Sequence, residues 1–327
     1  MIFIFIFSLN IFYFINTYML SWFIFAHATD TYEEATFYAQ TRKIIKNNPN
    51  TRIWIFYVYS KKIGKLFLIE NGEMKHVFNQ NKKKMSTETW CGTILKYVME
   101  HDEHNKFGLV YYGHAGSIVV GPWVDPTMSF LKFTQVFMKR LKPLIFLGDA
   151  CLLGSIESLY EMAPYCRFFA GSPSYHPYQS FITLESFARP TTNLTSAGLT
   201  KYVRKLSCEF NSIEKLPNYG CVIAFDLKNL REITKNIKNI VFKKENAINN
   251  YQYDLADSVV ESGPRKKLKE LVINKKCMQN KCPKKIHGIT ISTREVGESW
   301  NIKFSKMAWG KLLKKINTSK ESKESNE

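Results

Sequence analysis

The chain has 327 residues, of which 45% are hydrophobic and 14% aromatic, so it is long and apolar enough to bury a large core. This composition excludes an intrinsically disordered protein and a small disulfide-rich scaffold. The formal net charge of +18 favours anionic partners in general. The basic residues are nevertheless spread along the chain, and no nucleic-acid-binding motif is present, so we do not expect nucleic acid to be the partner.

The first twenty residues are almost uncharged, which is typical of a hydrophobic leader or membrane anchor, and residues 26–28 resemble a cleavage site. Two features weaken this interpretation. No Lys or Arg precedes the apolar run, and the run continues into a predicted strand that cleavage would destroy. Alternatively, translation starts at Met19 and residues 1–20 are an artefact. The compartment stays open: secreted or membrane-associated if residues 1–28 are a signal or anchor, otherwise cytoplasmic.

Apolar runs alternate with amphipathic segments, which predicts an α/β fold with a mainly parallel sheet in one domain, residues 21–316. An Asn71-Gly72 pair between two extended runs predicts a hairpin. Ser86 or Thr87 is expected to cap a helix. A lysine-rich loop is expected over 263–286, and a disordered polar tail over 317–327. Strands are predicted at 22–28, 52–60, 107–116, 143–151, 168–174, 221–227 and 287–293, and helices at 31–47, 86–101, 127–141, 196–210, 228–243 and 304–316.

Seven cysteines are present, an odd number in a long chain. Cys277 and Cys282 are spaced like one half of a metal site, but no second Cys or His pair accompanies them. We therefore interpret them as two surface thiols and predict no metal site.

Two predicted strands end in reactive groups. The run "LVYYGHAG" presents His114 and the run "LIFLGDAC" presents Cys151. Function gathers at the carboxyl ends of strands in open α/β sheets, so the two groups meet at one edge if these strands are neighbours. A thiol whose proton an imidazole can take is the pair needed for acyl transfer. Each residue alone is more commonly structural, and the pairing makes catalysis a serious hypothesis.

The rest of such a site can be assigned by position. Backbone amides near Ala115, Gly116 and Cys151 are candidates for holding a tetrahedral oxyanion. The start of the helix after Cys151 is expected to favour the thiolate. Other histidines compete with His114 for the role of base: His101, His104, His176 and His287.

The segment from Asp149 to about Phe181, "DACLLGSIESLYEMAPYCRFFAGSPSYHPYQSF", resembles the clostripain family of caspase-like (clan CD) cysteine peptidases. The His114 block is similar to the family's histidine block, and weaker similarity covers most of residues 21–316. The resemblance implies a caspase-like three-layer sandwich with a central, mainly parallel sheet flanked by helices. It also implies a thiol protease that hydrolyses peptide bonds after Arg or Lys in peptide or protein substrates, with calcium as a possible cofactor.

By position, the resemblance makes Cys151 the nucleophile and His114 the catalytic histidine. Asp149 then helps to form the pocket for the substrate side chain before the cleaved bond; its alternative role is to accept hydrogen bonds from turn amides. The sequence departs from the family at Ala115, where a glycine is usual, and at the pocket loop, where Gln179 and Phe181 are the substrate-binding candidates. The alternative function is a catalytically degenerate peptidase fold retained as a binding protein, possibly tethered to a membrane by residues 1–20.

Overall fold

The computed structural model describes most of the chain from residue 20 onward. The predicted leader or anchor therefore lies outside the described residues, apart from Leu20. The described ranges are 20–27, 31–47, 51–58, 63–82, 85–116, 119–120, 128–174, 176, 180–188, 194–213, 221–243, 247–249, 252–278, 282, 286, 288–292 and 305–324.

An eight-stranded sheet forms the centre of the molecule, in the order β11-β10-β9-β5-β1-β2-β3-β4. Strands β10, β9, β5, β1 and β2 are parallel. At one end of the sheet β11 is antiparallel to β10, and at the other β3 is antiparallel to both β2 and β4. The bounds are β1 Ser21–His27, β2 Ile53–Val58, β3 Ile63–Glu70, β4 Glu73–Asn81, β5 Phe107–Tyr112, β9 Ile145–Asp149, β10 Phe168–Gly171 and β11 Ile223–Asp226.

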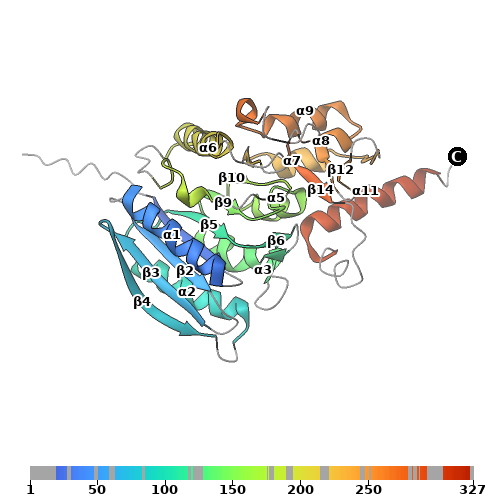
Figure 1. Ribbon diagram of the computed structural model, residues 1–327. Coiled ribbons are helices and arrows are strands. Elements are labelled where there is room, and N and C mark those ends of the chain that lie inside the picture. Colours follow the sequence, from blue (N-terminus) through green and yellow to red (C-terminus); the bar gives the residue numbers. More distant parts are fainter. Residues whose placement is uncertain are drawn as a thin grey trace, which may run out of the picture.

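Helices cover both faces of this sheet, so the fold is a three-layer sandwich, as the family resemblance implied (Figure 1). Alternate residues of β1 point to opposite layers, Phe23 and Phe25 to one and Trp22 and Ile24 to the other. One face packs on α1 (Thr31–Asn47) and α6 (Ser196–Asn211). The other packs on α2 (Thr87–His101), on a continuous helical segment and on α5 (Ile156–Met162). That segment comprises α3 (Phe130–Phe133), a π-helical stretch (Thr134–Met138) and α4 (Lys139–Leu141).

Smaller elements complete the fold. Two three-stranded sheets combine β6 (Ala115–Gly116), β7 (Val119–Val120) and β8 (Met128–Ser129), and β12 (Ala247–Asn249), β13 (Gln252–Asp254) and β14 (Thr290–Ser292). The remaining helices are α7 (Leu230–Lys235), α8 (Leu255–Ser258), α9 (Ser262–Glu270) and α11 (Ala308–Glu324), with short 3₁₀ turns at Phe181–Thr183 and Lys275–Cys277.

Several local predictions are confirmed in detail. Asn71 and Gly72 both have positive φ, 54° and 76°, and join β3 to β4 as the predicted hairpin turn. The Ser86 side chain accepts a hydrogen bond from the Thr89 amide and caps α2. Both features depend only on residues next to one another in the chain.

Three predicted segments differ from the structure. The helix predicted over 228–243 is reduced to α7, and the basic stretch expected to be a loop contains α9. Pro264 lies in the first turn of α9, where a missing N–H costs nothing, and the lysines that follow are good helix formers. Helix α11 continues to Glu324, into the tail for which the composition predicted disorder.

The interpretation of Cys277 and Cys282 as surface thiols is wrong. Cys277 is bonded to Cys208 of α6, and Cys282 to Cys221 just before β11, with Cα–Cα distances of 5.2 and 5.0 Å. The partners are 69 and 61 residues apart in the chain, so only the tertiary fold brings them together. The two bonds fasten the segment after α9 to the sheet and to α6.

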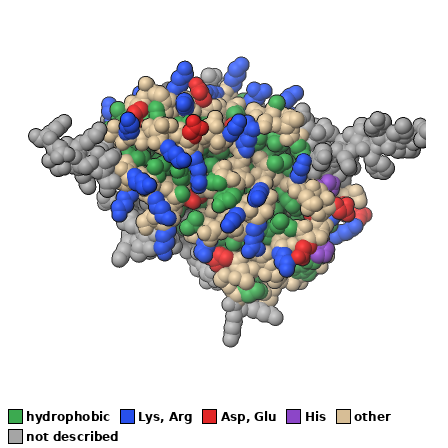
Figure 2. Space-filling view, turned by 180° about the vertical axis from the view of Figure 1, so that it is seen from behind, with side chains coloured by type: hydrophobic (Ala, Val, Ile, Leu, Met, Phe, Trp, Pro, Cys, Tyr) green, Lys and Arg blue, Asp and Glu red, His purple; other side chains and the backbone are tan. Residues whose placement is uncertain are grey.

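The chain carries a formal net charge of +18. On the face shown in Figure 2, Lys and Arg side chains are spread over most of the surface and acidic side chains are few. Within the part of the chain that the structure describes, no helix is both long and apolar enough to span a membrane.

Candidate functional site

The two reactive strand ends lie side by side at one edge of the sheet. β5 and β9 are parallel neighbours whose last paired residues are Tyr112 and Asp149. The Gly113 amide continues this pairing by donating to the Asp149 carbonyl at 3.2 Å. His114 and Cys151 each follow their paired residue by two positions, so the structure brings both to the same edge, as the sequence predicted.

The turn that presents His114 is held by its neighbours. Gly113 has a φ of 149°, and a Cβ at this position would lie 2.9 Å from the carbonyl oxygen of His27. Glycine is therefore required here for both conformation and space. The buried Tyr111 hydroxyl donates to the His114 carbonyl oxygen at 2.6 Å. The backbone of His114 is thus fixed while its side chain is exposed to solvent.

Cys151 lies in a turn that is fastened to the segment after β10. The Leu152 amide donates to the Ser174 carbonyl at 2.7 Å, and the Gly154 amide donates to the Ser172 carbonyl at 2.8 Å. Helix α5 begins only at Ile156, so the expectation that a helix start stabilises the thiolate is wrong. The turn itself, and not a helix terminus, sets the position of the thiol.

The protonated form of Cys151 is favoured in the structure. The residue is half-buried, and this burial raises the pKa of its thiol. The His176 amide, which donates to Sγ at 3.2 Å, acts in the opposite direction without cancelling the effect of burial. A nucleophilic role for Cys151 therefore needs a base to accept its proton.

Asp149 is the buried carboxylate of the site, with a side chain only 1% exposed. It accepts a hydrogen bond from the Ser180 hydroxyl and others from the Phe181 amide at 2.9 and 3.1 Å. Burial raises its pKa to about 7, against the opposing effect of these two donors. The predicted role as an acceptor for turn groups is confirmed.

His176 is the competing histidine that the structure places beside Cys151. Its Nε2 lies 3.5 Å from Asp149 Oδ1, and its backbone amide contacts the thiol. His104 instead contacts Ser21 and Asp102 at the opposite edge of the sheet, where β1 begins. His287 lies outside the described residues. Sequence reasoning named His176 only as one of four rivals, because nothing local shows where a loop after β10 turns.

The other predicted site residues fall in different surroundings. Ala115 and Gly116 form β6, which pairs with β7 next to the His114 turn. The Phe181 side chain is fully buried and packs on Phe210 with ring centroids 5.0 Å apart, so its backbone alone reaches Asp149. Gln179 lies outside the described residues.

Two buried carboxylates of α5 connect the helix after Cys151 to the C-terminal segments. Glu157 accepts a hydrogen bond from the Ser292 amide of β14 at 2.9 Å, and burial raises its pKa to about 7. Glu161 accepts hydrogen bonds from the Ala308 and Trp309 amides at the start of α11. No local sequence signal predicts these partners, because they are more than a hundred residues away in the chain.

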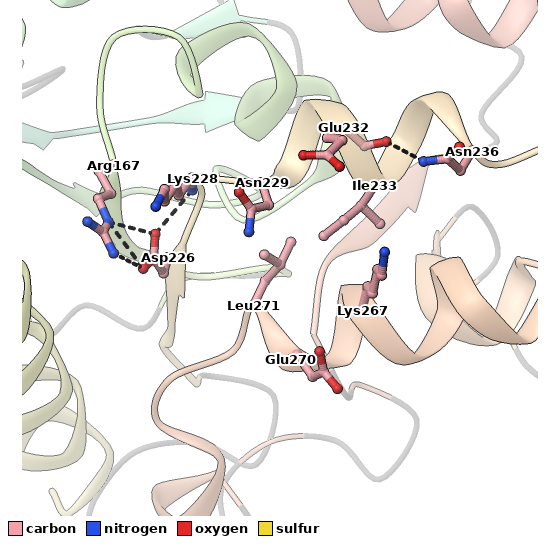
Figure 3. Close-up of a pocket in the computed structure, with 10 residues that line it drawn as sticks. All are labelled: Arg167, Asp226, Lys228, Asn229, Glu232, Ile233, Asn236, Lys267, Glu270 and Leu271. Atoms are coloured by element: carbon pink, nitrogen blue, oxygen red, sulfur yellow. Dashed lines mark hydrogen bonds and ion pairs between the residues drawn. The ribbon is translucent and has the colours of Figure 1, made fainter.

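One cavity among the described residues lies far from this edge. It has a volume of about 360 Å³ and is lined by residues of α7, α9 and the adjoining strand ends (Figure 3). Arg167, which precedes β10, donates to Asp226 through Nε and Nη2 at its rim. The amino end of β10 and the carboxyl end of β9 are at opposite edges, so this cavity is separate from Cys151.

A calcium site finds no support among the described residues. Within those ranges, no three His, Cys, Asp or Glu side chains gather closely enough to hold a metal ion. A calcium requirement stays a prediction from the resemblance.

The fold shows the class of solved structures to which this chain is similar. No family model matches the sequence, and no curated protein matches it. Similar solved structures include C11 cysteine proteases, the clostripain family, so the expected resemblance is confirmed at the level of the fold.

Three of these structures cover 90% of this chain and 98% of their own. An inactive zymogen of a C11 protease from Parabacteroides distasonis superposes with a TM-score of 0.61 at 13% identity. A secreted C11 protease from Bacteroides thetaiotaomicron, iotapain, gives 0.63 at 16% identity. A secreted C11 protease from the same organism, in complex with an irreversible peptide inhibitor, gives 0.65 at 12% identity.

Proposed function

We propose that this protein is a cysteine endopeptidase in which Cys151 is the nucleophile and His114 the general base. The observation that supports this most strongly is the register of β5 and β9, whose paired ends at Tyr112 and Asp149 set His114 and Cys151 on one edge. The shared fold with C11 cysteine proteases supports the same chemistry.

Because burial raises the pKa of the Cys151 thiol, the proposed cycle starts from the protonated thiol. His114 takes the thiol proton as Sγ attacks the carbonyl carbon of the substrate and forms the C–S bond. The C–N bond then breaks, and the amine leaves with the proton from His114. Water, deprotonated by His114, attacks the thioester, which releases the carboxylate product and restores the thiol.

The developing oxyanion needs donors close to both strand ends. We assign this role to the backbone amides of Cys151 and of the Ala115–Gly116 segment. The Cys151 turn is fixed by its hydrogen bonds to residues 172–174, and β6 is fixed by its pairing with β7. Amides held in this way need little reorganisation when negative charge appears.

We further propose that the preferred bond follows Arg or Lys, with Asp149 as the carboxylate that pairs with the cationic side chain. A charge-assisted, bidentate contact of this kind is strong when it is shielded from water. Asp149 meets the requirement for burial and is two residues from the nucleophile. Burial also raises its pKa, so pairing with a cation is expected to strengthen as pH rises above about 7.

Turnover of fluorogenic peptides tests the proposal directly. Peptides that differ only in the residue before the cleaved bond are offered to the wild type, to Cys151→Ala and to His114→Ala. Each variant is expected to lose at least about a hundredfold in kcat/KM, the range in which loss of a general base falls. Equal turnover by wild type and Cys151→Ala would show that another group performs the reaction.

Alkylation provides a matched control for the nucleophile. Cys91 and Cys166 are free but fully buried, and burial raises the pKa of both thiols. Iodoacetamide or an arginyl chloromethylketone is therefore expected to label Cys151 alone in the folded protein. Peptide mapping by mass spectrometry identifies the labelled residue.

One observation favours the alternative of a degenerate peptidase fold that only binds peptides. Burial raises the pKa of the Cys151 thiol, and its Sγ already accepts a hydrogen bond from the His176 backbone amide. Under this alternative, the peptide panel shows saturable binding to the wild type without turnover. Selective labelling of Cys151 by a peptide-directed reagent argues against it.

A further inference from the structure

His176 makes two separate contacts with the residues that frame the proposed nucleophile. Its backbone amide donates to Cys151 Sγ at 3.2 Å, and its Nε2 lies 3.5 Å from Asp149 Oδ1. Both side chains of the second contact are almost completely buried, 6% and 1% exposed. His176 therefore contacts the thiol through its backbone amide and lies beside the buried carboxylate through its imidazole.

Asp149 is held more firmly than the imidazole of His176 that contacts it. Asp149 is fixed by the Ser180 hydroxyl and the Phe181 amide, which approach both of its oxygens. The contact of His176 with Asp149, at 3.5 Å, is longer than a strong charge-assisted hydrogen bond. A substrate group that competes for Asp149 would therefore displace the imidazole more readily than it would move the carboxylate.

Aromatic packing keeps the imidazole in this position. Its ring meets the edge of Phe210 with centroids 5.5 Å apart, and Phe210 also packs on Phe181. Both phenylalanines are fully buried. The ring of His176 thus occupies a defined position against α6.

We propose that His176 is a specificity-determining residue, which occupies the place beside Asp149 that a cationic substrate side chain would take. This inference rests on the proposed function, since it concerns the residue before the cleaved bond. Substrates with Arg or Lys must displace the imidazole to reach Asp149, whereas uncharged side chains need not. The protein is therefore less selective for Arg and Lys than its buried carboxylate alone would make it.

Binding to an inactive variant tests this without requiring turnover. In the Cys151→Ala background, calorimetry compares two peptides that span the cleaved bond and differ only in Arg or norleucine before it. The His176→Ala substitution is expected to lower the dissociation constant of the Arg peptide at least about tenfold, which is the effect of gaining one charge-assisted contact. The norleucine peptide is expected to change less than about threefold, since it makes no ionic contact with Asp149.

Three further variants separate this explanation from a general loosening of the site. Adding Asp149→Asn to His176→Ala should abolish the gain for the Arg peptide. His176→Ser, which also leaves a small side chain, should reproduce the gain if His176→Ala unfolds. His101→Ala removes an exposed imidazole that stacks on Tyr97 and should leave both affinities unchanged.

The outcomes distinguish this inference from the proposed function. Unchanged or weaker binding of the Arg peptide to the His176 variants overturns the inference, even if the wild type cleaves peptides. A selective gain together with no turnover by the protein with Cys151 intact supports the inference and overturns the endopeptidase. Failure of every variant to bind either peptide contradicts both.

Discussion

The hydroxyl of Tyr111 donates a hydrogen bond of 2.6 Å to the carbonyl oxygen of His114, three residues further along the chain. Tyr111 is fully buried on β5, so the contact connects the core of the sheet to the backbone of an exposed histidine. It spans Gly113, whose positive φ allows the chain to turn back on itself. We therefore regard Tyr111 as a positioning residue for His114.

Tyr111→Phe is expected to lower kcat about tenfold with little change in KM, because the base is misplaced and substrate contacts are kept. The free energy of unfolding should fall by about 1 kcal/mol for the lost hydrogen bond. Tyr202→Phe is the matched control, since its buried hydroxyl accepts from the Ala188 amide away from His114. Equal losses of kcat in the two variants would refute a positioning role.

The reactivity of Cys151 should follow the raised pKa of its thiol. Because burial disfavours the thiolate, the rate of alkylation by iodoacetamide is expected to be still rising with pH at about 8.5, where an ordinary thiol is half ionised. Quenching the alkylation at several times and measuring the labelled fraction by mass spectrometry gives the rate at each pH. A plateau reached below pH 7 would mean that the unliganded protein already holds a thiolate–imidazolium pair.

The buried Glu157 should make stability depend on pH. Its pKa is raised to about 7, whereas in the unfolded chain it is about 4.3. At a pH between these two pKa values, the folded state keeps a proton that the unfolded state has lost. The free energy of unfolding therefore falls as pH rises. Glu157→Gln keeps an acceptor for the Ser292 amide and cannot ionise, so it should remove this fall.

Urea unfolding at several pH values measures the effect. The Glu157→Gln variant should be more stable than the wild type by roughly 1 to 3 kcal/mol at pH 8, and similar to it near pH 4. The raised pKa of Asp149 adds the same slope to both proteins and cancels in the comparison. Glu103→Gln is the control: this side chain is 83% exposed, so the dependence of the free energy of unfolding on pH should not change. Lower stability of Glu157→Gln at pH 8 would contradict the assignment.

The two disulfides should be detectable by counting thiols. Three free cysteines, Cys91, Cys151 and Cys166, are expected to react in denaturant without reductant, and seven after reduction. Each bond closes a loop and so restricts the unfolded chain. Removing either bond should therefore lower the free energy of unfolding by roughly 2 to 4 kcal/mol. The Cys208→Ala and Cys221→Ala variants test the bonds separately by thermal unfolding. Seven thiols without reductant would rule out both bonds.

The sequence alone determined features that depend on neighbouring residues. Alternating apolar runs predicted a mainly parallel α/β sheet, the Asn71-Gly72 pair predicted its hairpin, and Ser86 predicted its helix cap. The placement of His114 and Cys151 just after apolar runs predicted their common edge, because parallel strands all end on the same side of a sheet. These signals are local, so they can be interpreted without knowing the rest of the fold.

The tertiary structure decided what depends on distant residues. It made β5 and β9 neighbours, set His176 against Asp149, paired the four cysteines, and removed Asp149 and Glu157 from water. Loop direction and burial arise only when the whole core closes, since the cost of ionising a carboxylate depends on all the atoms that replace its water. The identity of a titratable residue is therefore visible in the sequence, whereas its protonation state and its partner are properties of the folded chain.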